Sequence, residues 1–190
     1  MTLIGFFVGF GACVAIAAGQ PLLGLALFLV NRLLDGLDGA VARVNGTTDL
    51  GAFLDIVLDF LVYSGVILAF AVADPERNAL PAAVLITSFV GTGSSFLAYA
   101  VIAAKRGQST QARGRKSIYY LGGLTEGSET MAVLSLMCLI PAWFPVLATL
   151  FAFLCWLTVA ARIYMAAEAF SDRSGPRQAS QPTTSVRQAE

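Results

Sequence analysis

The chain has 190 residues, of which 57% are hydrophobic and only 13% charged, and its mean hydropathy is +0.74. An average soluble domain is about one-quarter charged, so this composition leaves too little polar surface to cover a water-soluble globule. Twelve Lys and Arg residues balance twelve Asp and Glu residues, which leaves no basic excess, and we expect no nucleic-acid partner. Because histidine is absent, acid–base or metal chemistry must rest on carboxylates. The composition predicts a membrane protein.

Several apolar segments are long enough to cross a bilayer, which requires about 20 mostly apolar residues. Turn residues or charges separate them, for example Gly19-Gln20-Pro21 and the run from Asp74 to Asn78. We therefore predict an all-α fold, an integral membrane bundle of six transmembrane helices. The predicted spans are residues 2–18, 21–43, 50–73, 79–104, 121–140 and 145–169.

Lys and Arg residues gather on one side of these spans. The segment 105–117 carries five of them and no acidic residue, and the polar segment after the last span adds three more. By the positive-inside rule, both termini face the cytosol, which agrees with an even number of spans. We expect residues 1–170 to form one membrane domain and residues 171–190 to form a disordered polar tail.

The first apolar segment has an alternative interpretation as a signal peptide, because Ala15-Ile16-Ala17 resembles a cleavage site. However, no basic residue precedes its apolar run, and its removal would leave an odd number of spans. We therefore expect this segment to be retained as the first helix of the bundle.

Acidic residues are concentrated in the second and third predicted spans. Five of the twelve fall within 25 positions, and four of these, Asp35, Asp38, Asp55 and Asp59, lie inside the spans. Each charge at a bilayer centre costs roughly 2.5–3.5 kcal/mol on insertion scales, so this set requires compensation by water, a cation or an interfacial position. Helical geometry places the pair in each span on one face. Because the link between the spans is short, we expect antiparallel neighbours whose four carboxylates surround one pocket.

Four carboxylates around one pocket would repel one another without a counter-charge. Hard divalent cations with oxygen ligands remove this conflict, and Mg²⁺ keeps positions open for substrate phosphates. Gly39, Ala42 and Gly51 lie on the carboxylate faces, where small residues either leave room for a ligand or allow close helix packing. Arg43 follows Gly39 by one turn and is either a cytosolic anchor or a phosphate clamp.

The run from Asp35 to Arg43 (DGLDGAVAR), then seven residues, then Gly51, Asp55 and Asp59 resemble the signature of the CDP-alcohol phosphatidyltransferase family. That signature reads D-x-x-D-G-x-x-A-R, seven or eight residues, then G-x-x-x-D-x-x-x-D, and every specified position is filled here. The resemblance implies a six-helix membrane fold, usually a homodimer. It also implies that the chain belongs to a bacterial branch of the family. The protein would then be a multi-pass protein of the inner (plasma) membrane, with its active site facing the cytosol.

The resemblance further implies a reaction and the residues that perform it. A substituted phosphate passes from a CDP-linked donor, typically CDP-diacylglycerol, to an alcohol acceptor, and CMP is released, as in phospholipid biosynthesis. Two divalent ions, Mg²⁺ or Mn²⁺, would bind the carboxylates, and Asp59 would also act as the general base. The implied metal ligands are Asp35, Asp38, Asp55 and Asp59, and the implied CDP-binding residues are Gly39, Ala42, Arg43 and Gly51.

Further charged residues indicate an acceptor site. Glu126 and Glu129 lie one turn apart in an apolar segment, and Arg162 lies in the last span. These residues either line the acceptor pocket, or Arg162 forms a buried ion pair with one of the two glutamates. The basic segment 105–117 either binds a phosphorylated acceptor, such as glycerol phosphate or inositol phosphate, or sets the topology and contacts anionic lipid. The candidate acceptor pocket comprises Arg113, Arg115, Lys116, Glu126, Glu129 and Arg162.

Two other classes of protein also place carboxylates inside a membrane. An ion- or proton-coupled transporter usually shows inverted repeats with broken helices, whereas the two halves of this chain do not resemble each other. A Mg²⁺-dependent prenyltransferase uses Asp-rich motifs, but usually in two separated motifs and with more spans. Dependence on a CDP-linked donor distinguishes the phosphotransferase from both alternatives.

Overall fold

The computed structural model describes residues 2–46, 48–106 and 127–171, and these residues form helices joined by short links, without strands. The predicted all-α fold is confirmed, and the helix bounds lie close to those expected from the hydropathy pattern. Part of the fifth predicted span (121–126) and the tail beyond Ser171 lie outside the described residues. The elements are α1 (Thr2–Ala17), α2 (Pro21–Asn45), α3 (Asp49–Ala73), α4 (Pro75–Lys105), α6 (Gly127–Leu139), a 3-10 turn η1 (Pro141–Trp143) and α7 (Phe144–Ser171).

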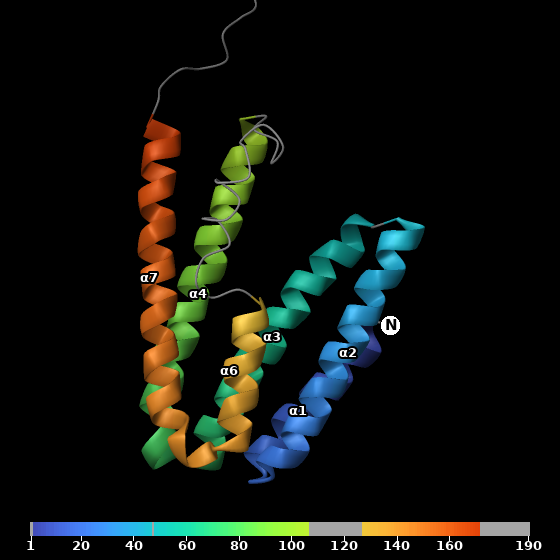
Figure 1. The fold of residues 1–190 in the computed structure, drawn as a ribbon, viewed down its shortest axis with the longest axis vertical. Helices are drawn as coiled ribbons and strands as arrows, with labels where there is room; N and C mark the ends of the chain where they lie inside the picture. The colour runs from blue at the N-terminus through green and yellow to red at the C-terminus, as the bar shows by residue number, and fades with distance from the viewer. Residues whose placement is uncertain (1, 47, 107–126, 172–190) are drawn as a thin grey trace, which may run out of the picture.

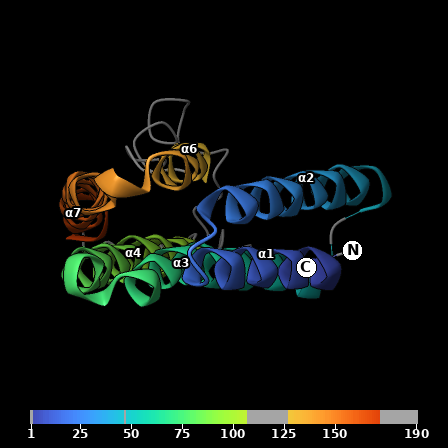
Figure 2. The same ribbon diagram turned by 90° about the horizontal axis from the view of Figure 1, so that it is seen from below.

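The helices form two layers. Seen from below, α7, α6 and α2 form one layer, and α4, α3 and α1 form the other (Figure 2). The most extensive packing joins α4 to α7 and α1 to α2, followed by α1 with α3 and α3 with α4. The α2–α3 link and the C-terminal ends of α4 and α7 lie at one end of the bundle, whereas the α1–α2, α3–α4 and α6–α7 links lie at the other (Figure 1).

Local sequence signals set the helix ends. Gly19, with φ of 76°, precedes α2, which begins with a proline, and Gly46, with φ of 92°, follows its last residue. The hydroxyl oxygen of Thr48 caps α3 by accepting a hydrogen bond from the backbone N–H of Gly51 at 3.1 Å. Asp74 accepts a corresponding bond from Arg77 N–H at the start of α4, at 3.3 Å.

The apolar core occupies one part of the bundle and ends partway along α2 and α3. No α2 residue beyond Asn31 with a described side chain is buried, and the first buried residue of α3 is Val62. Below this level, Phe70 and Phe144 stack with ring centroids 4.6 Å apart, and Phe28 is fully buried. The segment of α2 and α3 nearest their link therefore lies outside the core.

Within the described residues, three helical segments are long and apolar enough to cross a membrane: Asp49–Ala73, Pro75–Lys105 and Pro141–Ser171. Shorter apolar helices cover Leu3–Ala17 and Gly127–Leu139. Many large apolar side chains point outward, among them Leu80 at 76% exposure, as expected for a surface that faces lipid rather than water.

Close packing of α1 against its neighbours depends on glycine. A Cβ atom at Gly24 of α2 would collide with the Ile16 side chain and lie 3.1 Å from the Ala12 carbonyl oxygen, which belongs to the backbone and cannot swing away. Gly9 of α1 likewise faces Val62 of α3, where an added Cβ would lie 2.8 Å from Val62 Cγ2. Small residues that let membrane helices approach closely therefore hold α1 between α2 and α3.

We expect Gly24→Ala to destabilise the bundle by about 1–3 kcal/mol, because the added methyl overpacks the α1–α2 interface. The matched control is Gly36→Ala on the same helix, where nothing lies within 4 Å of the added Cβ. Alanine there should leave stability unchanged or raise it, since alanine favours helix over glycine. Thermal unfolding in detergent micelles measures both, and equal melting temperatures for the two variants would contradict this packing interpretation.

Candidate active site

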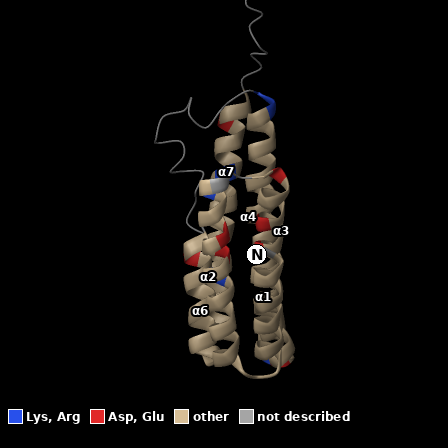
Figure 3. Cartoon of the chain, turned by 90° about the vertical axis from the view of Figure 1, so that its right-hand side faces the viewer, with Lys and Arg blue, Asp and Glu red and all other residues tan. Residues whose placement is uncertain are grey.

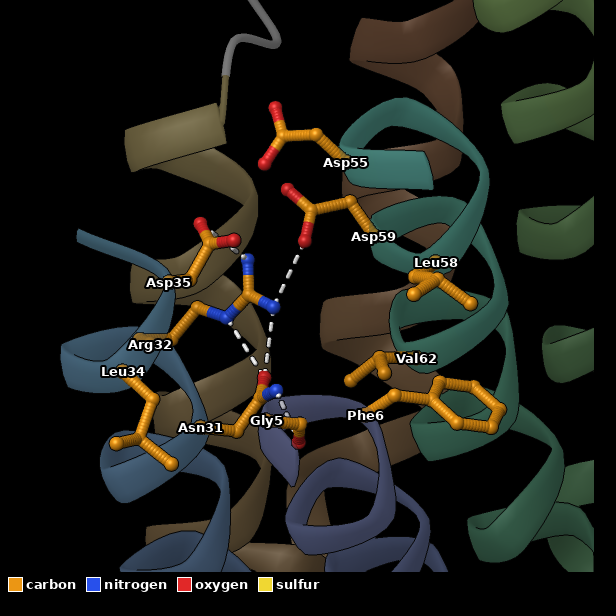
Figure 4. A pocket seen from close by; sticks show the side chains of 10 residues that line it. All are labelled: Gly5, Phe6, Asn31, Arg32, Leu34, Asp35, Asp55, Leu58, Asp59 and Val62. Atoms are coloured by element: carbon orange, nitrogen blue, oxygen red, sulfur yellow. Dashed lines mark hydrogen bonds and ion pairs between the residues drawn. The ribbon is translucent and has the colours of Figure 1, made fainter. Parts of the chain in front are cut away.

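A pocket lies between α1, α2 and α3 at the level where the apolar core ends (Figure 4). Its floor includes the first turns of α1, and its walls are the facing sides of α2 and α3. Apolar side chains form part of the lining, and charged side chains from both walls point into it. The lining residues are Gly5, Phe6, Asn31, Arg32, Leu34, Asp35, Asp55, Leu58, Asp59 and Val62.

Three of the four predicted metal ligands line this pocket. Asp35 projects from α2, and Asp55 and Asp59 project from successive turns of α3 (Figure 4). The side chains of Asp35 and Asp59 are 32% and 27% exposed, so neither is fully removed from solvent. Asp38 lies about one turn further along α2, is half-buried, and is not among the lining residues.

The predicted nucleotide-binding residues lie between this pocket and the α2–α3 link. Gly39 and Ala42 are half-buried on α2, and Gly51 is half-buried in the first turn of α3. Arg43 is exposed, and its Nη1 atom lies 3.6 Å from the position that a Cβ on Gly39 would occupy. The guanidinium of Arg43 therefore lies against the face of α2 that carries Gly39.

The spacing of the two carboxylate helices differs from the expectation. α2 and α3 run antiparallel, as predicted, but they make few close backbone approaches to each other, because α1 packs against both. The two carboxylate faces therefore meet across a gap rather than by direct helix packing. The short α2–α3 link (residues 46–48) joins the helices but does not draw them together along their length.

An arginine fills the gap between the carboxylates. Arg32 Nη2 lies 2.8 Å from Asp59 Oδ1, and Arg32 Nη1 lies 3.7 Å from Asp35 Oδ2. Nη1 also donates a hydrogen bond to Tyr63 Oη at 2.8 Å, and the guanidinium carbon lies 4.9 Å from the centre of that ring. This ion-pair network joins α2 to α3 at the level of the pocket.

Asn31 connects the same network to α1. Its Oδ1 accepts hydrogen bonds from Arg32 Nε at 2.9 Å and Nη2 at 2.7 Å, and its Nδ2 donates to the Gly5 carbonyl at 2.8 Å. Sequence reasoning did not identify Asn31, Arg32 or Tyr63. Helical spacing could have pointed to two of them. Arg32 precedes Asp35 by three positions, and Tyr63 follows Asp59 by four, so each shares a helix face with a predicted site residue.

The side chains that could bind a metal ion in this pocket suit a hard cation. The lining offers three carboxylates and one guanidinium, a net charge of minus two, without imidazole or thiol. As the side chains lie, the described part of the chain contains no group of three or more acidic, Cys or His residues placed to chelate one ion. The ligand types and the net charge therefore fit Mg²⁺ or Mn²⁺, and chelation requires the carboxylate side chains to move closer together.

The candidate acceptor residues are only partly described. Arg162 is buried in α7, where its Nη1 donates to the Thr92 carbonyl of α4 at 2.8 Å and its guanidinium lies 5.6 Å from the Phe96 ring centre. Glu129 is exposed near the start of α6, and its Oε2 accepts a hydrogen bond from Ser128 Oγ at 2.9 Å. Arg113, Arg115, Lys116 and Glu126 lie outside the described residues.

The fold and the pocket define a helical membrane protein with an acidic site between its helices. Residues 1–164 match the CDP-alcohol phosphatidyltransferase family, and the chain belongs to that family. The predicted family membership is therefore confirmed.

Individual relatives support this assignment to different extents. The chain is 51% identical over 164 residues to "Inner membrane protein YnjF" of Escherichia coli K12, which covers 86% of this chain and 80% of that protein. It is 49% identical over 61 residues to "Bifunctional IPC transferase and DIPP synthase" of Aquifex aeolicus, 31% of this chain and 14% of the relative. It is 44% identical over 62 residues to "Archaetidylinositol phosphate synthase" of Methanothermobacter thermautotrophicus, 32% of each chain.

Proposed function

We propose that this protein transfers a substituted phosphate group from a CDP-linked donor, CDP-diacylglycerol or another CDP-alcohol, to an alcohol and releases CMP. The observation that carries this proposal is the convergence of Asp35, Asp55 and Asp59 from two helices on one pocket at the end of the apolar core. Two relatives whose names describe a transferase or synthase support a phosphotransferase role. The product would belong to phospholipid biosynthesis.

The motif residues divide between cation binding and nucleotide binding. Asp35, Asp38, Asp55 and Asp59 would hold two divalent cations, Mg²⁺ or Mn²⁺. These cations, when bound, neutralise diphosphate oxygens and stabilise the departing CMP. The exposed guanidinium of Arg43 would donate to the diphosphate. The small residues Gly39, Ala42 and Gly51 would let the nucleotide approach the helix backbones.

Asp59 is the proposed general base. An alcohol is a weak nucleophile near pH 7, so a carboxylate must accept its proton as the new bond forms. In the proposed step, the acceptor hydroxyl gives its proton to Asp59 while its oxygen attacks the phosphorus that carries the lipid group. The bond from that phosphorus to the bridging oxygen breaks, and CMP leaves with the electron pair.

We place the pocket on the cytosolic side of a bacterial inner membrane. In this arrangement the domain of residues 1–170 crosses the membrane six times, with both termini in the cytosol and residues 171–190 as a tail. Lys105 and Arg106 end α4 at the end of the bundle that carries the α2–α3 link (Figure 3), and the positive-inside rule assigns such an end to the cytosol. A homodimer is the expected assembly.

The acceptor would bind beside the nucleotide. We assign its site to Arg113, Arg115, Lys116, Glu126, Glu129 and Arg162. The burial of Arg162 in an apolar helix supports this choice, because a cation in that position is costly to retain without a function. A phosphorylated alcohol, such as glycerol phosphate or inositol phosphate, suits the excess of basic residues in this set.

The direct test measures CMP release by purified protein in detergent or lipid vesicles. The donor is CDP-diacylglycerol with Mg²⁺, and the acceptors are glycerol 3-phosphate, serine, inositol, inositol phosphate and choline. We expect CMP with at least one acceptor, and its loss when EDTA removes the divalent cation. CMP formation that persists in EDTA would contradict the metal assignment, and transport or prenyl transfer without CMP would favour the alternative classes.

Asp59→Asn should lower kcat for CMP release by about 10²–10⁴-fold, because an amide cannot accept the acceptor's proton. The KM for the donor should rise as well, because Asp59 is also a proposed ligand of the cations that would neutralise the diphosphate. Asp49→Asn is the matched control, because Asp49 is an exposed aspartate in the first turn of the same helix and outside the pocket. An active Asp59→Asn enzyme would exclude Asp59 as the base.

Arg162→Ala and Arg113→Ala should each raise the KM for the acceptor far more than the KM for the donor. Arg106→Ala serves as the control, because Arg106 donates to the Ala169 and Phe170 carbonyls at 3.2 and 3.0 Å and stabilises the end of α7 instead. Steady-state kinetics with each substrate varied in turn separates the two constants. Equal changes in both constants would count against the acceptor assignment.

A further inference from the structure

Arg32 is the cation that lines the carboxylate pocket, and only 9% of its side chain is exposed. It is absent from the family signature described above, yet its guanidinium contacts Asp59 on α3 at 2.8 Å and approaches Asp35 on α2 at 3.7 Å. One side chain therefore links the proposed base to a proposed metal ligand on the facing helix.

Contacts from α2 and α3 hold the guanidinium in place, and one of its partners is tied in turn to α1. Asn31 Oδ1 accepts from both Nε and Nη2, and the Asn31 amide is itself bound to the Gly5 carbonyl of α1. Tyr63 Oη accepts from Nη1, and the Tyr63 ring packs against the guanidinium. Because the donors of a guanidinium lie in one plane with fixed directions, fixing this group also fixes the orientation of the Asp59 carboxylate that it binds.

We infer that Arg32 is a positioning residue for the phosphotransfer reaction. It binds Asp59 through Oδ1, so the other oxygen, which points to the side of the pocket where Asp55 lies, is presented to the substrate (Figure 4). It also neutralises one of the three carboxylate charges and so limits the affinity of the pocket for cations. The positioning role rests on the proposed function, whereas the charge effect applies to any divalent cation that enters the pocket.

Two substitutions separate geometry from charge. Arg32→Lys keeps the positive charge but lacks the planar fork, so we expect kcat to fall about 100-fold, as for a misplaced catalytic group, with Mn²⁺ affinity close to that of the wild type. Arg32→Gln removes the charge as well, so we expect a similar fall in kcat together with about tenfold tighter Mn²⁺ binding. The donor KM should stay within about threefold in both variants, since neither touches the nucleotide site. Electron paramagnetic resonance of Mn²⁺ titrated into the purified protein measures binding independently of turnover.

A control variant and a second substitution in the Arg32 network keep the test valid if the Arg32 variants fail to fold. Arg77→Gln removes an exposed arginine from the far end of the bundle, where its Nη2 donates to the Ala142 carbonyl at 2.6 Å, and should leave Mn²⁺ binding unchanged. Tyr63→Phe removes one anchor of Arg32 while keeping every pocket charge. We expect a fall in kcat of about three- to tenfold with unchanged Mn²⁺ affinity, because the guanidinium keeps its other anchors.

Specific outcomes would overturn the inference. Wild-type kcat in Arg32→Lys would show that charge alone suffices, and unchanged kcat in Tyr63→Phe would exclude positioning even if the Arg32 variants fail to fold. Loss of Mn²⁺ binding in Arg32→Gln would make Arg32 a structural residue only. If the wild type releases no CMP, the proposed function is wrong. In that case tighter Mn²⁺ binding in Arg32→Gln still supports the charge role, and unchanged binding refutes it.

Discussion

Carboxylates inside an apolar bundle require a counter-charge, and the ion pair between Arg32 and Asp59 supplies part of it from within the chain. The pair lies at the level where the buried core ends, so the carboxylates are neither fully desolvated nor fully exposed. Such a position lowers the cost of retaining the charges while keeping their interactions stronger than in bulk water. One guanidinium does not neutralise three carboxylates, however, and the remaining negative charge of the lining is the feature on which the proposed cation site rests.

The shape of the pocket follows from the way α1 packs. Glycines at the interfaces let α1 lie close to both α2 and α3, and its bulk keeps those two helices from packing directly on each other. The first turns of α1 reach the pocket through Gly5 and Phe6, so the helix that separates α2 and α3 also forms part of the floor between them. Asn31 then ties this floor to the guanidinium. Packing and electrostatics in this part of the molecule therefore depend on the same three-helix junction.

Hydropathy and helical periodicity predicted the helices and the two carboxylate faces, because both depend on residues near in sequence. The α2–α3 spacing could not be predicted in this way, since it depends on α1 packing between segments that adjoin each other in the chain. The role of Arg32 was missed for a related reason. Its partner Asp59 lies 27 positions away on another helix, and only the tertiary structure shows which of several nearby charges it contacts. Arg162 illustrates the same limit, because its hydrogen bond to the Thr92 carbonyl has no sequence signature.

The location of the pocket suits a reaction between a lipid and a polar molecule. A lipid-linked donor keeps its acyl chains among apolar side chains, whereas a cation and a polar acceptor must come from water. These requirements coincide only where the apolar core of the bundle gives way to polar residues, and on α2 this change occurs between Phe28 and Asp35. Arg32 lies within that interval, with its guanidinium carbon 5.8 Å from the centre of the Phe28 ring and its Nη2 atom 2.8 Å from Asp59 Oδ1. The side chain that pairs with Asp59 therefore also marks the depth at which the proposed lipid-linked donor and polar acceptor would meet.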